Sequence, residues 1–244
     1  MLRVYHASVL PLLGRKGGEG LSRYRKEKLA RISNPRAYAR SLGAELLLAA
    51  ALQELGGPMP PLEISRGEGG KPRIAGGPEF SLSHSGERVL CALSDRAVGA
   101  DIQQLRPYKP ALVRRFFTAE EGAWLEEQRE RDLAFSLLWS LKESYVKLLG
   151  SGIAGVHLDS FTVRVLSDGR ARIDGSNAKL WYAIRDDYVM SACSAADAAP
   201  ETVRELILEN TRCVFAPLVC CLHIQSQVTH GGQKAAPVLF TDLR

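Results

Sequence analysis

The stretch VGADIQQL, Val98 to Leu105, decides the prediction of the fold. It is an apolar, strand-like run with one acid, Asp101, in its middle. Residues two apart on a strand point to the same side, so Asp101 shares a face with Gln103, while Ala100 and Ile102 pack on the other face. Taken alone, these residues favour a plain strand end, although a carboxylate and an amide oxygen on one face can both reach Mg²⁺.

Helices and short strands alternate around this run in two similar series. Helices are expected at about 21–32, from Asn34 and Pro35 to Gly56-Gly57, at 111–117, 119–128 and 132–150, and near 200–209. Strands are expected at 62–65, 80–85, 88–94, 97–104, 161–166, 170–173, 180–185 and 188–194. Each half thus places helices before antiparallel strands, which predicts an α+β fold of two lobes. We expect an N-terminal lobe at 1–105, a C-terminal lobe at 106–209 and an atypical peripheral tail at 210–244.

The composition is that of a globular protein with a basic surface. The 244 residues carry a formal net charge of +5, which suits acidic partners, yet the basic runs also hold apolar residues at helical spacing. Nucleic-acid binding would rest on this charge alone, and we do not expect it. Five cysteines without a CxxC pair argue against a disulfide framework or a zinc site. No apolar run approaches the length of a membrane span, so no membrane association and a cytoplasmic location are expected.

A second motif lies on the helix LLWSLKESYVKLLGSG, which starts at Leu137. Trp139, Glu143 and Lys147 are each four residues apart and lie on one face, where Glu143 and Lys147 can form an i,i+4 ion pair. A solvent-facing pair would contribute little to stability. Trp139 in line with the pair suggests that the face is covered instead. Spacing alone leaves both interpretations open.

A third motif is GGKPRIAGGPEFSLSHS, which holds Lys71, Ser83, His84 and Ser85. The paired glycines before Lys71 let the backbone approach a ligand, and the lysine, histidine and hydroxyls can bind phosphate. The spacing of a P-loop is missing, and a strand rather than a helix follows. A lone His84 is more often structural than a ligand.

In series, these motifs resemble those of the 4′-phosphopantetheinyl transferases of the surfactin-synthetase type. The family pattern GKP, SHS, [VI]G[VI]D and WxxKE[SA]xxK stands here as Gly70-Lys71-Pro72, Ser83-His84-Ser85, Val98-Gly99-Ala100-Asp101 and Trp139 to Lys147. The resemblance spans roughly residues 20 to 195. It implies a pseudo-dimer of two similar α+β lobes, with coenzyme A (CoA) and Mg²⁺, or Mn²⁺ in its place, in the cleft between them.

The resemblance also implies an activity and a set of site residues. Such enzymes move the phosphopantetheine arm of CoA to a serine of an apo acyl or peptidyl carrier protein and release adenosine 3′,5′-bisphosphate. Asp101 and Glu143 match metal ligands, Glu143 also matches the acceptor of the serine proton, and Lys147 matches the residue beside the leaving pyrophosphate. The positions that match CoA contacts are Arg25, Lys28, Arg40, Ser41, Lys71, Pro72, Ser83, His84 and Lys142.

One departure from the family pattern concerns the metal. Many members have a second acid where this chain has Gln103, so we expect Gln103 to join Asp101 and Glu143 as a neutral metal ligand that holds Mg²⁺ less tightly. The alternative is a catalytically weakened homologue that binds CoA or a carrier protein. The two-lobe size resembles the monomeric branch that serves polyketide or nonribosomal peptide biosynthesis. The carrier itself is not specified by the sequence.

Overall fold

The computed structural model describes residues 1–17, 20–150, 155–166, 169–195, 200, 203–206 and 208. The predicted tail, 210–244, lies outside the described residues. The helices are α1 (Arg23–Leu29), α2 (Pro35–Gln53), α3 (Pro110–Phe116), α4 (Ala119–Glu127) and α5 (Arg131–Leu149), with 3₁₀ turns at Leu10–Leu12, Glu68–Gly70 and Leu158–Ser160. The strands are β1 (Leu2–Ser8), β2 (Ile64–Arg66), β3 (Pro72–Ile74), β4 (Glu79–Ser85), β5 (Arg88–Ser94), β6 (Val98–Gln104), β7 (Val163–Val165), β8 (Arg170–Ile173), β9 (Lys179–Arg185), β10 (Tyr188–Ser194) and β11 (Val203–Glu205).

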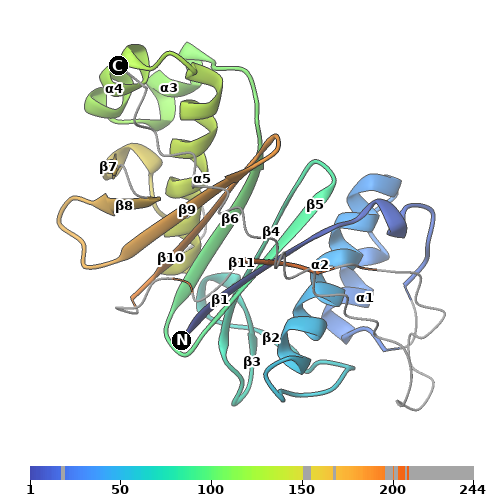
Figure 1. Ribbon diagram of the computed structural model, residues 1–244. Coiled ribbons are helices and arrows are strands. Elements are labelled where there is room, and N and C mark those ends of the chain that lie inside the picture. Colours follow the sequence, from blue (N-terminus) through green and yellow to red (C-terminus); the bar gives the residue numbers. More distant parts are fainter. Residues whose placement is uncertain are drawn as a thin grey trace, which may run out of the picture.

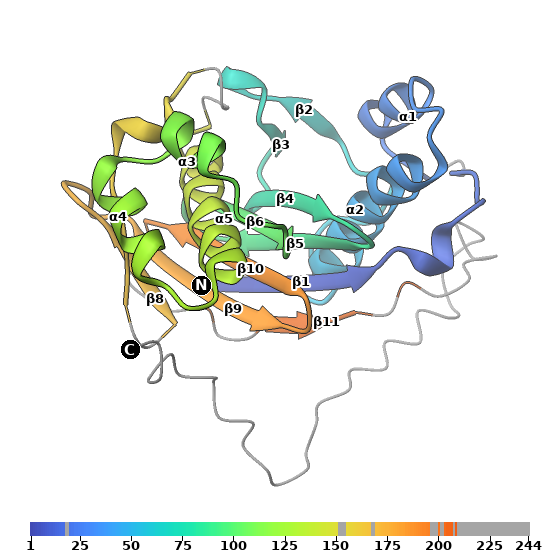
Figure 2. The same cartoon turned by 90° about the horizontal axis from the view of Figure 1, so that it is seen from above.

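These elements form four layers. One sheet has the order β11-β1-β5-β4 and the other β6-β10-β9-β8-β7, and the strands lie between α1 and α2 at one end and α3 to α5 at the other (Figures 1 and 2). β2 and β3 form a separate antiparallel pair. The α+β prediction is confirmed. No helix among the described residues has the length and apolar character needed to cross a bilayer.

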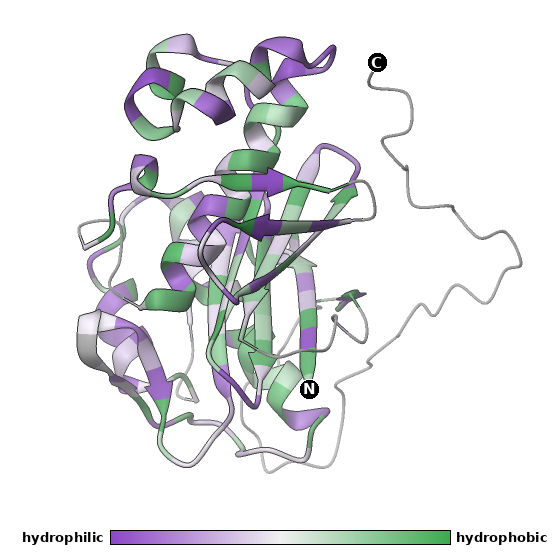
Figure 3. Ribbon diagram, turned by 90° about the vertical axis from the view of Figure 1, so that its left-hand side faces the viewer, coloured by the Kyte–Doolittle hydropathy of each residue, from purple (hydrophilic) through white to green (hydrophobic). Residues whose placement is uncertain are grey.

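The strands at the centre are buried on both faces, and this explains their nearly continuous apolar sequence. In β5, Cys91 and Leu93 pack toward α2, whereas Leu90 and Ala92 pack toward the other sheet. In β6, Ala100 and Ile102 likewise face the first sheet. Figure 3 shows the apolar segments running along these strands. The predicted alternation of β6 is therefore confirmed, and it turns Asp101 and Gln103 toward the other side.

The two lobes repeat one arrangement of strands. β1 precedes the first helices and pairs antiparallel with β5, and β6 precedes the second helices and pairs antiparallel with β10. By strand pairing, β6 and its Asp101 lie in the sheet of the C-terminal strands. The lobe boundary expected after residue 105 stays a prediction.

The sequence analysis missed one strand and predicted a helix where the structure has another strand. The strand β1 was not predicted, because Leu2–Ser8 mixes apolar residues with Arg3 and His6 without a clear alternation. The helix predicted near 200–209 is instead the short strand β11, which pairs in parallel with β1. An available strand edge at β1 outweighs the weak helical pattern, because pairing satisfies the backbone groups of both segments.

Gly99 allows α5 to approach β6 closely. A Cβ atom at Gly99 would lie 1.9 Å from the backbone oxygen of Ser144 and 2.3 Å from the backbone nitrogen of Leu148. Three fully buried serines on α5, at 136, 140 and 144, face the same side and keep the helix surface small. Ser140 donates a hydrogen bond to the backbone oxygen of Asp101 (3.4 Å). This close packing positions the polar residues of α5 beside those of β6.

We predict that Gly99→Ala lowers the free energy of unfolding by about 1–3 kcal/mol or more, because backbone atoms cannot give way as a side chain can. Urea denaturation measures the change. The control is Gly122→Ala on α4, where the added Cβ would make only an ordinary 3.5 Å contact with Val113. Equal stability of the Gly99→Ala variant and the wild type would contradict the close approach.

Candidate active site

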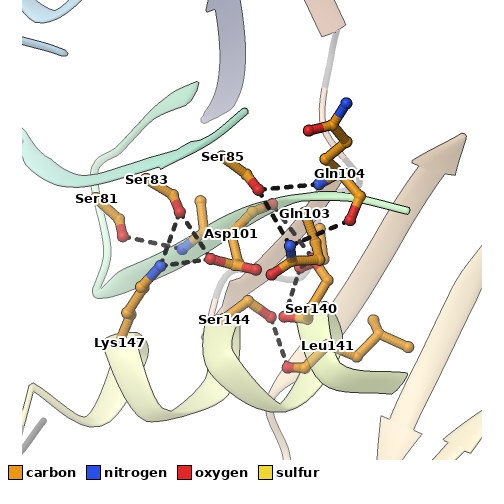
Figure 4. A network of polar contacts seen from close by, with 12 residues as sticks. Ser81, Ser83, Ser85, Asp101, Gln103, Gln104, Ser140, Leu141, Ser144 and Lys147 are labelled. Atoms are coloured by element: carbon orange, nitrogen blue, oxygen red, sulfur yellow. Dashed lines mark hydrogen bonds and ion pairs between the residues drawn. The ribbon is translucent and has the colours of Figure 1, made fainter. Parts of the chain in front are cut away.

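Alternating serines of β4 join the two sheets (Figure 4). Ser81 accepts a hydrogen bond from the backbone nitrogen of Ala100 (2.9 Å). Ser83 donates to Asp101 Oδ1 (2.7 Å), and Ser85 accepts from the backbone nitrogen of Gln104 (3.0 Å). Because residues two apart on a strand share a face, the sequence SLSHS places all three hydroxyls along the edge of β6. The sheets are therefore held in register at the candidate site.

Asp101 is the central anion of the site. The residue is about one-twentieth exposed, and Oδ1 accepts hydrogen bonds from Ser83 and from Lys147 Nζ (2.6 Å). Oδ2 is buried and has no hydrogen-bond partner among the described residues. A buried carboxylate oxygen without a donor is costly, which marks it as a position where a ligand can bind.

Glu143 lies one helical turn before Lys147 on α5 and is also buried, with 8 % of the residue exposed. Burial raises the pKa of its carboxyl, the charge of Asp101 raises it further, and the charges of Lys147 and Arg106 oppose the rise. The carboxylate has no hydrogen bond with the described residues. The charge of Asp101 is thus close enough to destabilise the ionised form of Glu143.

Lys147 does not form the predicted i,i+4 pair with Glu143. Its ammonium instead donates to Asp101 Oδ1 and to Ser83 Oγ (2.9 Å), which closes a triangle between α5, β6 and β4 (Figure 4). Lys147 retains 29 % side-chain exposure, so it lies at the rim while Asp101 lies behind it. The suggestion from Trp139 that this face is covered is confirmed. Trp139 packs against Phe116, Phe117 and Phe135.

Gln103 lies beside Asp101 on the same face of β6 and is buried. Its Nε2 donates to Ser85 Oγ (3.1 Å) and to the backbone oxygen of Gln104 (3.2 Å). These two bonds fix the amide, so Oε1 is the atom that can accept from a ligand. Its placement is compatible with the predicted ligand role, which stays a prediction.

Several predicted CoA contacts lie on the first lobe and carry positive charge. Lys71 donates to the backbone oxygen of Val98 (2.6 Å), next to the site strand, and Pro72 follows it at the start of β3. Arg40 on α2 donates to the backbone oxygen of Gly86 (3.1 Å), just beyond the SHS motif. These contacts tie both cations to the ends of β4 and β6.

His84 is exposed and surrounded by cations. Desolvation and the charges of Arg40, Lys28 and Lys147 lower its pKa to about 4, although a backbone hydrogen bond opposes this. Because the residue is exposed, we attribute more of the effect to the three charges than to burial. The pKa of Lys28 is also lowered, by desolvation and by the charges of Arg25 and Arg66. This excess of positive charge favours an anionic ligand.

Arg25 and Ser41, two of the predicted CoA contacts, lie in a buried network. Arg25 is 3 % exposed, and it donates to Glu45 Oε2 (3.1 Å) and to Ser41 Oγ (3.0 Å). Glu45 also accepts from the backbone and hydroxyl of Ser22, the N-cap of α1. Both predicted phosphate ligands are therefore engaged in a buried network that fastens α1 to α2. The sequence did not indicate Glu45, which lies in an apolar helix.

Lys142, another predicted CoA contact, is also buried. Its ammonium is fully buried, donates to the backbone oxygens of Leu158 (2.6 Å) and Phe161 (2.7 Å), and forms an ion pair with Glu121 Oε2 (2.8 Å). Burial lowers the pKa of Lys142, and the charge of Glu121 opposes this. Lys142 lies on the side of α5 away from Asp101, where it stabilises the second lobe, and its contact with CoA stays a prediction.

Two arginines near the site were not predicted. Arg106 follows β6, its guanidinium lies 5.8 Å from the centre of the Trp139 ring, and its charge lowers the pKa of Glu143. Arg66 on β2 lies 5.4 Å from the centre of the Tyr24 ring, beside Lys28. Each arginine follows a predicted strand, and this position was the feature of the sequence from which it could have been predicted.

A divalent cation would fit the residues of this site. No group of three or more acidic, histidine or cysteine side chains forms a metal cluster within the described residues. The donors that are present are two carboxylates, Asp101 and Glu143, with the amide of Gln103 beside them. The partnerless Asp101 Oδ2 and the desolvated Glu143 are the hard oxygen ligands that Mg²⁺ prefers.

Comparison with known proteins identifies the family. Residues 97–193 match the model of the 4′-phosphopantetheinyl transferase superfamily. A 4′-phosphopantetheinyl transferase of Bacillus pumilus is 36% identical over 181 residues, which cover 70% of this chain and 77% of the relative. One from Bacillus subtilis (strain 168) is 34% identical over 61% of this chain and 70% of the relative. The chain belongs to the 4′-phosphopantetheinyl transferase superfamily.

The matched range of this transferase begins just before β6 and ends within β10, which pair with each other in the sheet of the C-terminal strands. Among solved structures, the holo-[acyl-carrier-protein] synthase from Neisseria meningitidis matches 41% of this chain and 98% of its own chain, with 20% sequence identity and a TM-score of 0.37. The corresponding synthase of Thermotoga maritima matches 40% of this chain and 61% of its own, with 18% identity and a TM-score of 0.35.

We predict that Lys142→Met lowers the free energy of unfolding of the transferase by about 3–5 kcal/mol, because Glu121 is left as a buried, uncompensated charge. Urea denaturation measures the loss. Lys179→Met, at an exposed lysine, is the matched control and should change stability by less than about 0.5 kcal/mol. A Lys142→Met variant as stable as this control would show that the ion pair does not support the lobe.

Proposed function

We propose that the transferase moves the 4′-phosphopantetheine arm of CoA to a serine of an apo acyl or peptidyl carrier protein. The serine oxygen forms a bond to the β-phosphorus of CoA, the bond from that phosphorus to the bridging pyrophosphate oxygen breaks, and adenosine 3′,5′-bisphosphate leaves. The carrying observation is the pair of buried carboxylates, Asp101 and Glu143, beside a lysine at the meeting point of the two lobes. Family membership supports the reaction class.

We further propose that the reaction depends on Mg²⁺, or Mn²⁺ in its place, held by Asp101 and Glu143 with the amide oxygen of Gln103. When bound, the cation supplies a Lewis acid that neutralises the pyrophosphate oxygens. Gln103 brings no negative charge, so this site holds a cation less tightly than one with three carboxylates. The chain's own contribution is to keep both carboxylates fixed on β6 and α5.

Glu143 is the proposed acceptor of the serine proton, directly or through water. An ordinary glutamate is a weak base at neutral pH, and a raised pKa brings the carboxylate closer to the pH at which proton transfer is efficient. Burial supplies this rise in the pKa of Glu143. The absence of hydrogen bonds from the described residues to its carboxylate leaves its oxygens free to accept.

Lys147 and the cations of the first lobe are proposed to hold the phosphates of CoA. Lys147, at the exposed rim, balances the charge that develops on the leaving pyrophosphate. His84, Arg40 and Lys28 form a positive group that suits the 3′-phosphate, and Arg66 extends this group. Lys71 donates to Val98, the first residue of β6, and is suited to bind the pyrophosphate.

We also propose an oligomeric state, a location and a class of partner for the transferase. Both sheets and both helix layers come from one chain, which supports a monomer. A cytoplasmic location fits the supply of CoA and carrier proteins. The positive balance of +5 suits carriers that are acidic around their serine. Nucleic acids and membranes are not proposed partners.

The second candidate is a homologue that binds CoA or a carrier protein with weakened catalysis. Gln103 favours it, because the amide adds no charge to the cation site. This candidate predicts CoA binding without turnover on any carrier.

The direct test is incubation with CoA, Mg²⁺ and a panel of apo acyl and peptidyl carrier proteins, followed by intact mass spectrometry. We expect one carrier or more to gain the mass of one phosphopantetheine arm. Asp101→Ala should lower kcat/KM more than 10²-fold, because the site loses its central charge. This corresponds to a rise of about 3–5 kcal/mol in the activation barrier. Asp174→Ala is the matched control, since Asp174 is exposed and pairs with Arg164 in the second lobe. No mass gain on any carrier, or full activity of Asp101→Ala, would contradict the proposal.

A further inference from the structure

Lys147 occupies part of the place where a metal ion would bind. Its ammonium is 2.6 Å from Asp101 Oδ1 and 2.9 Å from Ser83 Oγ, and Ser83 in turn donates to the same Oδ1 (2.7 Å). One carboxylate oxygen thus already accepts from two donors, one of them charged. The lysine acts as the counter-ion of Asp101 (Figure 4).

A divalent cation at Asp101 would meet this ammonium at close range. Like charges a few ångströms apart in a partly buried site repel strongly, because little water screens them. The charge of Glu143 attracts Lys147, but among the described residues the ammonium forms its ion pair with Asp101. The cation and the lysine therefore compete for one carboxylate.

Lys147 is the member of the triangle that can move. Asp101 and Ser83 are buried on paired strands, whereas Lys147 is 29 % exposed, near the end of α5, and its side chain has four flexible methylene groups. Gly150 follows in a left-handed conformation (φ 74°) and ends the helix. An anion outside the triangle could draw the ammonium away without disturbing either strand.

We propose that Lys147 is the resident counter-ion of the metal site and makes the binding of CoA and of the divalent cation cooperative. The inference rests on the proposed function, in which the pyrophosphate of CoA lies beside Lys147. When the pyrophosphate draws Lys147 away, Asp101 is released to the cation. The coupling is reciprocal, so the cation must also tighten CoA binding. Protein without CoA consequently binds divalent cations weakly.

The test is Mn²⁺ binding, measured by electron paramagnetic resonance of free Mn²⁺ with and without saturating CoA. A titration of CoA alone removes the contribution of Mn²⁺ bound by CoA in solution. For the wild type we expect CoA to tighten Mn²⁺ binding about tenfold, within the usual range of such couplings. For Lys147→Met we expect tighter Mn²⁺ binding than the wild type without CoA, and a much smaller effect of CoA.

Two further variants keep the test decisive. Lys147→Gln gives a second removal of the charge, and circular dichroism confirms that each variant is folded. Lys179→Met removes one exposed charge on β9, outside the triangle, and should behave as the wild type, which separates a local effect from a change in net charge.

The outcomes distinguish this inference from the proposed function. Mn²⁺ binding by Lys147→Met and Lys147→Gln that is no tighter than wild type without CoA would overturn the counter-ion role and leave the metal site intact. An equal gain in Lys179→Met would also overturn it. Absence of Mn²⁺ binding by every form, even with CoA, would contradict the metal site itself and the inference with it.

Discussion

The close contact between β6 and α5 at Gly99 is the constraint on which the site depends. A side chain at this position would collide with the backbone of α5 at Ser144 and Leu148, so only glycine permits the observed distance. The buried serines of α5 keep its surface small on the same side, and Ser140 links it to the backbone of Asp101. Because Glu143 and Lys147 lie on the next turns of α5, this contact brings them to Asp101.

The second feature of the site is the combination of fixed anions with a cation that can move. Asp101 is held by β10 on one side and by the hydroxyl of Ser83 on the other. Glu143 lies in the buried middle of α5, and Lys147 lies near its exposed end. Fixed carboxylates provide aligned cation ligands at little cost in reorganisation, whereas the lysine can follow the charge of a substrate. The cations of the first lobe extend this positive rim.

The local sequence pattern was sufficient to predict which side chains share a face of a strand or helix. The period of two along β6 predicted that Asp101 and Gln103 share a face, and the period of four along α5 predicted that Glu143 and Lys147 do. It could not predict which partner Lys147 takes, because Asp101 is distant in sequence and competes with Glu143. The order of the strands in the sheets could not be predicted from local pattern either. β6 pairs with β10, and most of the second lobe separates the two strands in sequence.

Burial sets three of the predicted CoA contacts apart from the others. Arg25, Ser41 and Lys142 have residue types that suit phosphate, but each is buried and satisfied by neighbours. Their partners, Glu45 and Glu121, lie in helices where an acid would normally face solvent. Sequence spacing alone does not reveal that such an acid is turned inward. The buried ion pairs stabilise each lobe internally, and the site lies where the lobes meet.

The central claim is that Asp101 and Glu143 together hold a divalent cation at the meeting point of the lobes. Anomalous diffraction from crystals grown with CoA and Mn²⁺ tests it most directly. The account predicts a Mn²⁺ peak coordinated by oxygens of both carboxylates. Bound CoA with no Mn²⁺ peak at these two side chains, or with a peak at other residues, would contradict it.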